Sequence, residues 1–122
     1  MHKHTVLIVE DETELLEFYG LILEADFNVI ALSNPLEAMD AMANNKIDIV
    51  VSDISMPQIN GRDLVLAIKN QYPLIKALGI SAHHHSVERN HMFDLYLQKP
   101  LVSLEKLNEA VKELISQTLL TK

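Results

Sequence analysis

The sequence predicts an α/β protein in which helices cover both faces of a doubly wound parallel sheet of five strands. Short apolar runs rich in β-branched residues alternate with segments whose apolar residues repeat at helical spacing. The first of these runs stops abruptly at acidic residues, as a strand buried on both faces does. Because parallel neighbours need crossover connections, this alternation favours such a sheet. We expect residues 1–122 to form a single domain, since no linker or repeat divides them.

The first predicted unit is a strand followed by a helix. Thr5–Val9 reads TVLIV and ends at the acidic run Glu10-Asp11-Glu12, which is therefore placed at the carboxyl end of a strand. The next segment has the i, i+3, i+4, i+7 apolar spacing of a helix that packs on a sheet. The members of this stripe are Leu15, Phe18, Tyr19, Ile22 and Leu23.

The second unit begins with a short strand at Asn28–Leu32. Asn34 can cap the following helix, and Pro35 can occupy its first position, where a backbone N–H is not needed. This helix is expected to run to about Asn45.

The third strand, residues 47–52, again ends at an acid, Asp53. A loop containing Pro57 and Gly61 follows, and we expect both to shape the loop, with Gly61 supplying a backbone angle that other residues resist. The next helix is predicted from about residue 63 to residue 71. Its inner face carries Leu64, Ala67 and Ile68.

The last strands and helix complete the pattern. Lys76–Ser81 reads as a fourth strand, and Tyr96–Gln98, just before Lys99-Pro100, reads as a brief fifth. The closing helix is expected to begin near Ser103, which can cap it. Its inward residues are Leu107, Val111, Leu114 and Ile115.

Composition excludes several functional classes. Apolar residues make up 48% of the chain and charged ones 22%, the balance of an ordinary globular protein. A net charge of −7 would repel nucleic acid and anionic membranes. The chain has no cysteine, which excludes disulfides and thiolate zinc sites, and no apolar run long enough to span a bilayer. We expect a soluble, cytoplasmic protein.

The strand ends gather polar groups that suit phosphoryl chemistry. Ligands of an open parallel sheet bind beyond the carboxyl ends of its strands, so Glu10, Asp11 and Asp53 should meet at one rim. A divalent cation would relieve their repulsion, and oxygen ligands favour Mg²⁺ or Mn²⁺. Lys99 can neutralise further negative charge, and Ser81 adds a hydroxyl donor. These groups form a cradle for a tetrahedral anion built on one carboxylate, which predicts phosphoryl transfer.

These residues resemble the receiver domain of two-component response regulators, of which the single-domain chemotaxis regulator is an example. The resemblance covers essentially the whole chain. It rests on VLIVEDE at 6–12, DISMPQING at 53–61, Ser81-Ala82 and YLQKP at 96–100, in the order of the family. It implies a flavodoxin-like fold with strand order 2-1-3-4-5, which agrees with the number of predicted strands.

The resemblance also implies the chemistry of the acidic residues. Asp53 would be the phosphoacceptor, attacking a phosphohistidine of a sensor histidine kinase or histidine phosphotransfer protein, or a small acyl phosphate. Asp11 and Asp53 would hold Mg²⁺ directly, with Mn²⁺ as a substitute. Glu10 would act through water, and the backbone carbonyl of Ser55 would complete the protein ligands.

Three further residues take implied roles in switching. Lys99 would bind a phosphoryl oxygen, and Ser81 would donate a hydrogen bond to another once Asp53 is phosphorylated. Tyr96 would follow Ser81 as an aromatic switch, with simple packing on the sheet as the alternative. The domain would then present a changed surface to a downstream protein target. We expect a stand-alone monomer or weak homodimer that catalyses at most its own phosphoryl transfer and dephosphorylation.

The segment between the fourth and fifth strands departs from the family pattern. Tyr96 follows Ser81 after about four residues fewer than usual, roughly one helical turn, and residues 86–94 lack a convincing apolar stripe. Met92-Phe93 replaces the usual small pair. We therefore expect a shortened helix here and an altered output face.

Histidines in the same segment suggest a zinc site as an alternative. His83, His84 and His85 are consecutive and His91 is near, but adjacent side chains diverge, and no cysteine or carboxylate spacing completes the ligand set. An exposed polar loop is the favoured interpretation, and a pH-sensitive loop is an alternative because imidazole titrates near neutrality.

Two other functional classes remain alternatives to the phosphoacceptor. A pseudo-receiver would bind a partner constitutively without phosphorylation, although the intact acid, hydroxyl and lysine set argues against it. A hydrolase with an aspartyl nucleophile, like the haloacid-dehalogenase-like phosphatases, would need a second acid two positions after the nucleophile, where this chain has Ser55.

Overall fold

The computed structural model describes residues 3–54, 56, 59–81, 93–99 and 104–120. Its five strands form one parallel sheet in the order β2-β1-β3-β4-β5, which confirms the predicted fold class and strand order. The strands are β1 (Thr5–Val9), β2 (Asn28–Leu32), β3 (Ile49–Asp53), β4 (Lys76–Ser81) and β5 (Leu95–Gln98). Among the described residues, no helix is long and apolar enough to cross a membrane.

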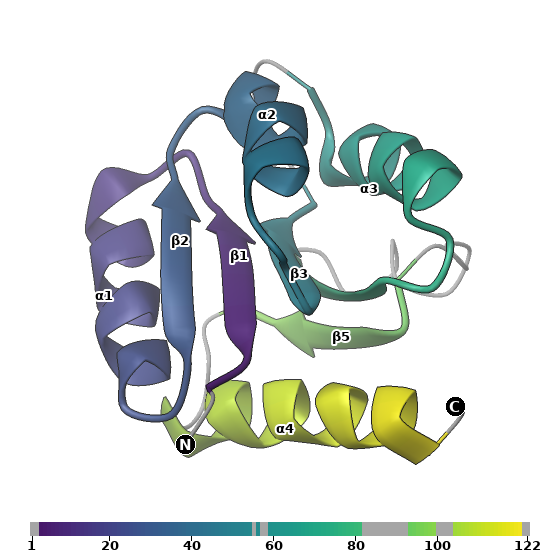
Figure 1. Ribbon diagram of the computed structural model, residues 1–122. Coiled ribbons are helices and arrows are strands. Elements are labelled where there is room, and N and C mark those ends of the chain that lie inside the picture. The colour runs from purple at the N-terminus through teal and green to yellow at the C-terminus, as the bar shows by residue number, and fades with distance from the viewer. Residues whose placement is uncertain (1–2, 55, 57–58, 82–92, 100–103, 121–122) are drawn as a thin grey trace.

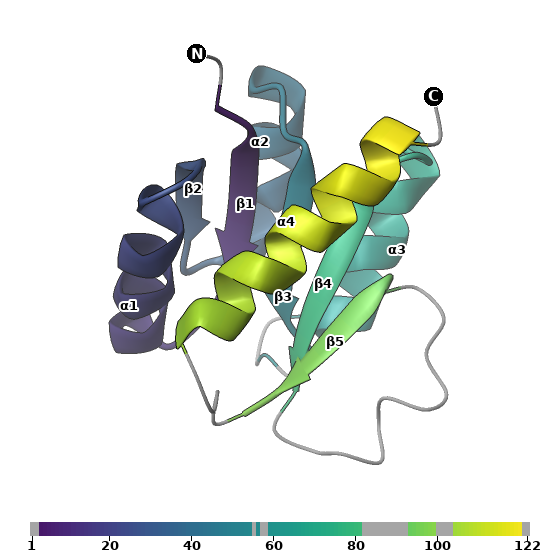
Figure 2. The same cartoon turned by 90° about the horizontal axis from the view of Figure 1, so that it is seen from below.

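The helices lie in two layers, one on each face of the sheet (Figure 1). The layer on one face contains α1 (Thr13–Glu24) and α4 (Leu104–Leu120), and the other contains α2 (Ala38–Asn44) and α3 (Gly61–Gln71). Figure 2 shows α1 and α4 in front of the strands and α2 and α3 behind them. This is the doubly wound arrangement that right-handed crossovers produce.

Side-chain alternation divides the inner strands between two hydrophobic cores. In β1, Val6 and Ile8 pack with α1 and α4, whereas Leu7 and Val9 pack with α2 and α3. All four side chains are fully buried. Burying a side chain of this size contributes about 1.5–3 kcal/mol, so the central strands give the residues at their carboxyl ends a firm support.

Helix α1 buries a stripe that differs in part from the predicted one. Four members of the predicted stripe contribute to the core, namely Leu15, Tyr19, Ile22 and Leu23. Phe18, however, is 44% exposed, so its predicted burial is wrong, and Leu16 is buried instead. Leu16, Tyr19 and Leu23 are spaced i, i+3 and i+7, which centres the buried face away from Phe18.

Side-chain caps define where two helical segments begin. The Asn34 side chain accepts a hydrogen bond from the backbone N–H of Leu36 at 3.0 Å, as predicted, although the first turn there is a 3₁₀ helix. Helix α3 begins at Gly61 rather than near Asp63. The reason is that the Asn60 side chain accepts a hydrogen bond from the Asp63 N–H at 2.9 Å and so caps the helix two residues before the predicted start.

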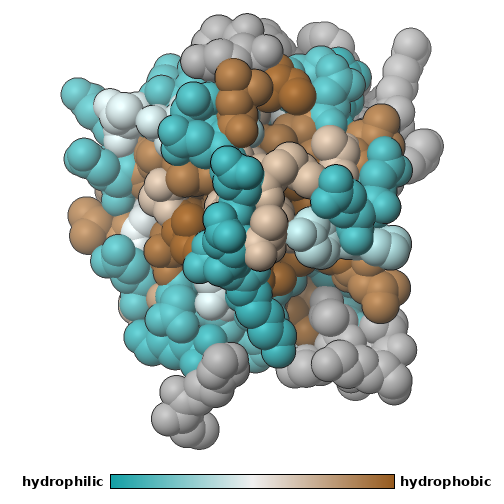
Figure 3. All heavy atoms as spheres, turned by 45° about the horizontal axis from the view of Figure 1, so that its top comes forward, coloured by the Kyte–Doolittle hydropathy of each residue, from teal (hydrophilic) through white to brown (hydrophobic). Residues whose placement is uncertain are grey.

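The outer surface of the α2 and α3 layer mixes hydrophilic and hydrophobic residues (Figure 3). Large hydrophobic side chains exposed on or beside these helices are Leu36, Leu66 and Leu74. Single exposed hydrophobic residues of this kind are common on protein surfaces. Most of the segment 86–94, where a shortened helix is predicted, lies outside the described residues, as does the predicted cap Ser103. The described residues 93 and 94 are not helical.

Candidate functional site

Backbone hydrogen bonds beyond the strands fix the rim where the predicted site residues lie. The Glu10 N–H donates to the Leu32 carbonyl at 3.1 Å, which ties the end of β1 to β2. The Lys99 N–H donates to the Ser81 carbonyl at 2.7 Å, which ties the residue after β5 to the end of β4. Residues that follow or end these strands are therefore held by the sheet itself rather than by free loops.

Three carboxylates meet at this rim. Glu10, Asp11 and Asp53 each offer one oxygen, and these oxygens all lie within 4.8 Å of one another. Glu10 is 1% exposed and Asp53 is 5% exposed, while Asp11 is half-buried. Carboxylate oxygens grouped at this spacing suit a hard divalent cation such as Mg²⁺. The predicted gathering of the acids is thus seen in the structure.

Lys99 places its ammonium between two of these acids. Its Nζ lies 3.1 Å from Oε1 of Glu10 and 3.2 Å from Oδ2 of Asp53. Burial by itself lowers the pKa of Lys99, but the Asp53 and Glu10 carboxylates raise it more, so the net shift is upward. Lys99 therefore remains a cation at the centre of the site.

Glu10 is the acid whose ionisation the site disfavours most clearly. Burial, followed by the negative charge of Asp53, raises the pKa of Glu10 from 4.5 to about 7. The Glu12 N–H, which donates to Oε2 at 3.3 Å, and Lys99 oppose this shift. In the described part of the chain, the buried Oε1 has no hydrogen bond, although it is in ionic contact with Lys99. A cation-bound water would give this oxygen a donor, so the residues present fit a metal.

Ser81 ends β4 and is 3% exposed, next to the strand that carries Asp53. Tyr96 lies on β5 opposite Gly79, and its ring centroid is 5.4 Å from that of Phe93. Burial raises the pKa of the Tyr96 hydroxyl. This packing fits both the switch role and the simple packing role predicted for Tyr96. Ser55 falls outside the described residues, as do Pro57 and the four histidines of the segment 83–91.

Gly61 is needed for space rather than for its backbone angle. Its φ does not lie in the left-handed region, so the predicted role in supplying an unusual angle is wrong. A Cβ added at Gly61 would overlap the Asp53 carbonyl oxygen and would lie 2.7 Å from Cα of Ile54. The start of α3 thus contacts the backbone of Asp53 itself. This contact holds Asp53, the candidate phosphoacceptor, against the helix.

Asp94, an acid that the sequence pattern does not single out, anchors the start of β5. Asp94 accepts hydrogen bonds from Nζ of Lys69 at 2.9 Å and from the Ala77 N–H at 2.8 Å. Nζ of Lys76 lies 3.9 Å away. These contacts fix the start of β5 to α3 and β4, and β5 leads directly to Lys99. The signal available in the sequence is an acid just before a short apolar strand, which is weak by itself.

Comparison with known sequences identifies relatives of this chain. A family model described as the response regulator receiver domain matches residues 6–112. The chain is 31% identical over 121 residues to the sensor kinase CckA of Brucella abortus, covering 93% of this chain and 13% of that protein. It is 34% identical over 114 residues to an uncharacterized response regulatory protein of Shewanella oneidensis, covering 88% and 47%. The chain thus spans less than half the length of both relatives.

Solved structures share the fold over nearly the whole chain. A CheY-like response regulator receiver domain protein from Methanospirillum hungatei superposes with a TM-score of 0.89 at 23% identity, covering 99% of this chain and all of the other. The response regulator protein TrrA of Thermotoga maritima, solved in complex with Mg²⁺ and BeF, has a TM-score of 0.82 at 27% identity. That comparison covers 91% of this chain and 98% of TrrA.

Proposed function

Because the chain belongs to the response regulator receiver domain family, we propose that it is the phosphoacceptor of a two-component phosphorelay. Asp53 accepts a phosphoryl group from a sensor histidine kinase or a histidine phosphotransfer protein in the cytoplasm. The observation that carries the proposal is the convergence of Glu10, Asp11, Asp53 and Lys99 at the rim of the sheet. In this proposal residues 1–122 act as one receiver domain.

The proposed reaction is a displacement at phosphorus. A carboxylate oxygen of Asp53 attacks the phosphoryl group, and an O–P bond forms as the P–N bond to the donor histidine breaks. The histidine nitrogen keeps the bonding electron pair, and Asp53 becomes an acyl phosphate. Asp53 is suited to this role because the backbone on both of its sides is held, by β3 and by the contact with Gly61.

The proposed metal site uses the acids of the same rim. Asp11 and Asp53 would bind Mg²⁺ directly, Glu10 would bind through water, and the Ser55 carbonyl would supply a further oxygen. When bound, Mg²⁺ would neutralise negative charge on the phosphoryl oxygens and on the crowded carboxylates. TrrA was solved with Mg²⁺ and BeF, which supports assigning a metal to this chain.

Lys99 has to change partners during the proposed reaction. It is now paired with Glu10 and Asp53, and the raised pKa keeps it charged. Once Asp53 carries a phosphoryl group, Lys99 would bind one of the new oxygens in place of the Asp53 carboxylate. A charge-assisted hydrogen bond of this kind is about twice as strong as a neutral one.

The proposed output is a shift between two conformations. Ser81 would donate its hydroxyl to a phosphoryl oxygen, and Tyr96 would move with it and alter the surface around β5. Phosphorylation biases this equilibrium as far as Ser81 and Lys99 bind the phosphoryl group better in the active arrangement. The partner that detects the change would be a downstream protein target.

Mass spectrometry of the intact protein tests the phosphoacceptor role. We expect incubation with Mg²⁺ and acetyl phosphate to add one phosphoryl group, and we expect Asp53→Asn or EDTA to prevent the addition. The exposed change Asp40→Asn on α2 is a matched control and should leave the addition intact. No adduct on the wild-type protein would favour a constitutive pseudo-receiver. Rapid multiple turnover without accumulation would favour a hydrolase.

A further inference from the structure

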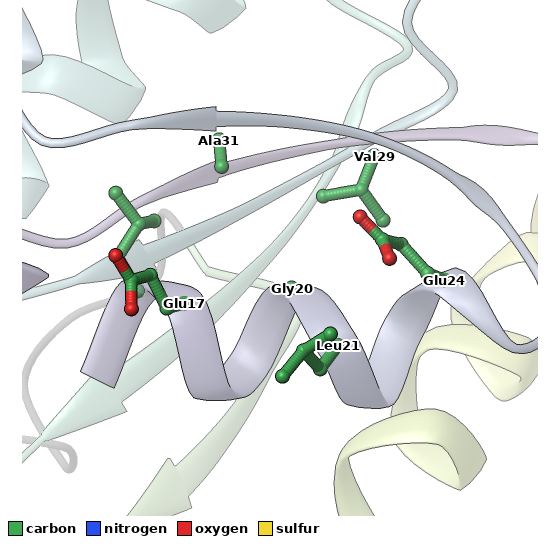
Figure 4. A pocket seen from close by; sticks show the side chains of 7 residues that line it. Glu17, Gly20, Leu21, Glu24, Val29 and Ala31 are labelled. Atoms are coloured by element: carbon green, nitrogen blue, oxygen red, sulfur yellow. The ribbon is translucent and has the colours of Figure 1, made fainter. Parts of the chain in front are cut away.

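A groove lies between α1 and the edge strand β2, on the opposite side of α1 from α4 (Figure 4). Its volume is about 390 Å³, which is enough to hold large apolar side chains. Apolar residues form its floor, and two acids stand beside it. The floor includes Leu16, Gly20, Val29 and Ala31, and Glu17 and Glu24 lie at the sides.

Gly20 is the unusual feature of this groove. It lies in the interior of α1, where glycine is less favourable than alanine. A Cβ added at Gly20 would meet nothing within 4 Å, and its φ is not in the left-handed region. The packing of the protein on itself therefore gives no reason for a glycine here. Gly20 is itself buried at the bottom of the groove, but the space that a Cβ would occupy is open, so a side chain of another molecule can approach the helix backbone there.

The two acids flank the bare position. Glu17 and Glu24 are separated by two helical turns, or about 10 Å along α1. Figure 4 shows both side chains extending from α1 toward β2 on either side of Gly20. Both are exposed, and within the residues that the structure describes neither takes part in an ion pair. The groove thus offers an apolar floor between two unpaired negative charges.

We propose that this groove binds a cationic amphipathic helix of another protein. An apolar side chain of that helix would rest over Gly20, and Lys or Arg residues seven positions apart would face Glu17 and Glu24. Seven positions on a helix span the same two turns as the acids, so both pairs can form at once. This binding does not depend on phosphorylation of Asp53.

A second copy of the chain is a poorer occupant. The nearest match among the described helices is α3, where Arg62 and Lys69 are seven positions apart on either side of the exposed Leu66. Lys69 is already paired with Asp94 at 2.9 Å, and binding Glu17 or Glu24 of a second copy would require breaking that ion pair. The net charge of −7 also opposes association of two copies.

A synthetic peptide tests the inference with the unphosphorylated protein. The probe is a fluorescein-labelled helical peptide of about 14 residues, with two lysines seven positions apart and leucines between them on the same face. We expect saturable binding by fluorescence anisotropy at low salt, with amide shifts at Leu21 and Val29 in NMR spectra. Glu17→Gln with Glu24→Gln should weaken binding about fivefold, since each exposed ion pair contributes little. Glu109→Gln with Glu113→Gln on α4 makes the same charge change away from the groove and should leave affinity within about twofold.

Substitutions at Gly20 separate binding from folding. Gly20→Ala should raise the thermal midpoint and still weaken peptide binding, and Gly20→Leu should weaken it at least about tenfold by filling the groove. Absence of wild-type binding, or equal losses in the α4 control, would overturn the proposal. Self-association that is abolished by Glu17→Gln with Glu24→Gln in sedimentation experiments would also overturn it, because the occupant would then be a second copy.

Discussion

Replacing Glu10 by glutamine should make the metal-free protein more stable above pH 7. Glu10 is 1% exposed, and burial with the nearby charge of Asp53 raises its pKa from 4.5 to about 7. Glutamine preserves the shape of the side chain and removes the charge that the buried site disfavours. A site built to hold a cation is expected to be strained in this way when the cation is removed.

The size and sign of the effect follow from proton linkage. When the pKa of a carboxyl group is higher in the folded protein, the protonated form favours folding. Its contribution to the free energy of unfolding is fully present below the unfolded pKa, here 4.5. That contribution is lost as the pH rises through the folded pKa of about 7. The difference between these pKa values corresponds to about 3 kcal/mol, at about 1.4 kcal/mol per pKa unit. Glutamine does not titrate. The free energy of unfolding of Glu10→Gln should therefore exceed that of the wild type by about 3 kcal/mol at pH 8 and by little below pH 5.

Urea unfolding in EDTA, followed by circular dichroism from pH 5 to pH 8, measures this difference. Glu109→Gln, on the exposed face of α4, is the matched control and should follow the wild type at every pH. Adding Mg²⁺ should reduce the difference in free energy of unfolding between Glu10→Gln and the wild type, because the ion binds the crowded carboxylates of the folded wild type. A stability difference between Glu10→Gln and the wild type that does not change with pH would refute this reasoning. So would equal free energies of unfolding for the two proteins at pH 8.

Three other substitutions give distinct expected results. Lys99→Met should lower the free energy of unfolding by about 3 kcal/mol in EDTA at pH 8, because two buried carboxylates lose their cation. It should also abolish the acetyl phosphate adduct, and a normal adduct yield would contradict this. Gly61→Ala should cost about 1–3 kcal/mol by displacing the Asp53 backbone and should slow phosphorylation, as measured by urea unfolding and adduct formation over time. Asp94→Ala should cost about 1–2 kcal/mol and speed amide exchange in β5, and unchanged exchange would show that these contacts do not hold the strand.

The arrangement of strands and helices could be predicted because apolar pattern and polar ends agree along the chain. In a chain of this composition, a short apolar run such as Thr5–Val9 strongly favours a buried strand over other structures. Which side of a helix is buried was harder to predict. Phe18 fits the apolar stripe of α1, but the neighbouring Leu16 completes the same stripe, and packing against α4 and the sheet decides between them.

The site was predictable as far as strand ends determine it. Parallel strands place their carboxyl ends at one rim, and this rule alone is enough to bring Glu10, Asp11 and Asp53 together. The same rule says nothing of close contacts across the sequence. The contact between Gly61 and the Asp53 carbonyl and the role of Asp94 both depend on how α3 and β5 pack, which local pattern does not encode.

In the proposed function, a phosphoryl group is attached to Asp53 with the help of the surrounding acids and Lys99. Reduction with borohydride converts an acyl phosphate to an alcohol, so trapping the phosphorylated protein and sequencing its peptides by mass spectrometry locates the adduct directly. We predict homoserine in place of Asp53, with its yield dependent on Mg²⁺ and strongly reduced in Lys99→Met. Homoserine at another aspartate, or an adduct that survives in Asp53→Asn, would contradict the claim.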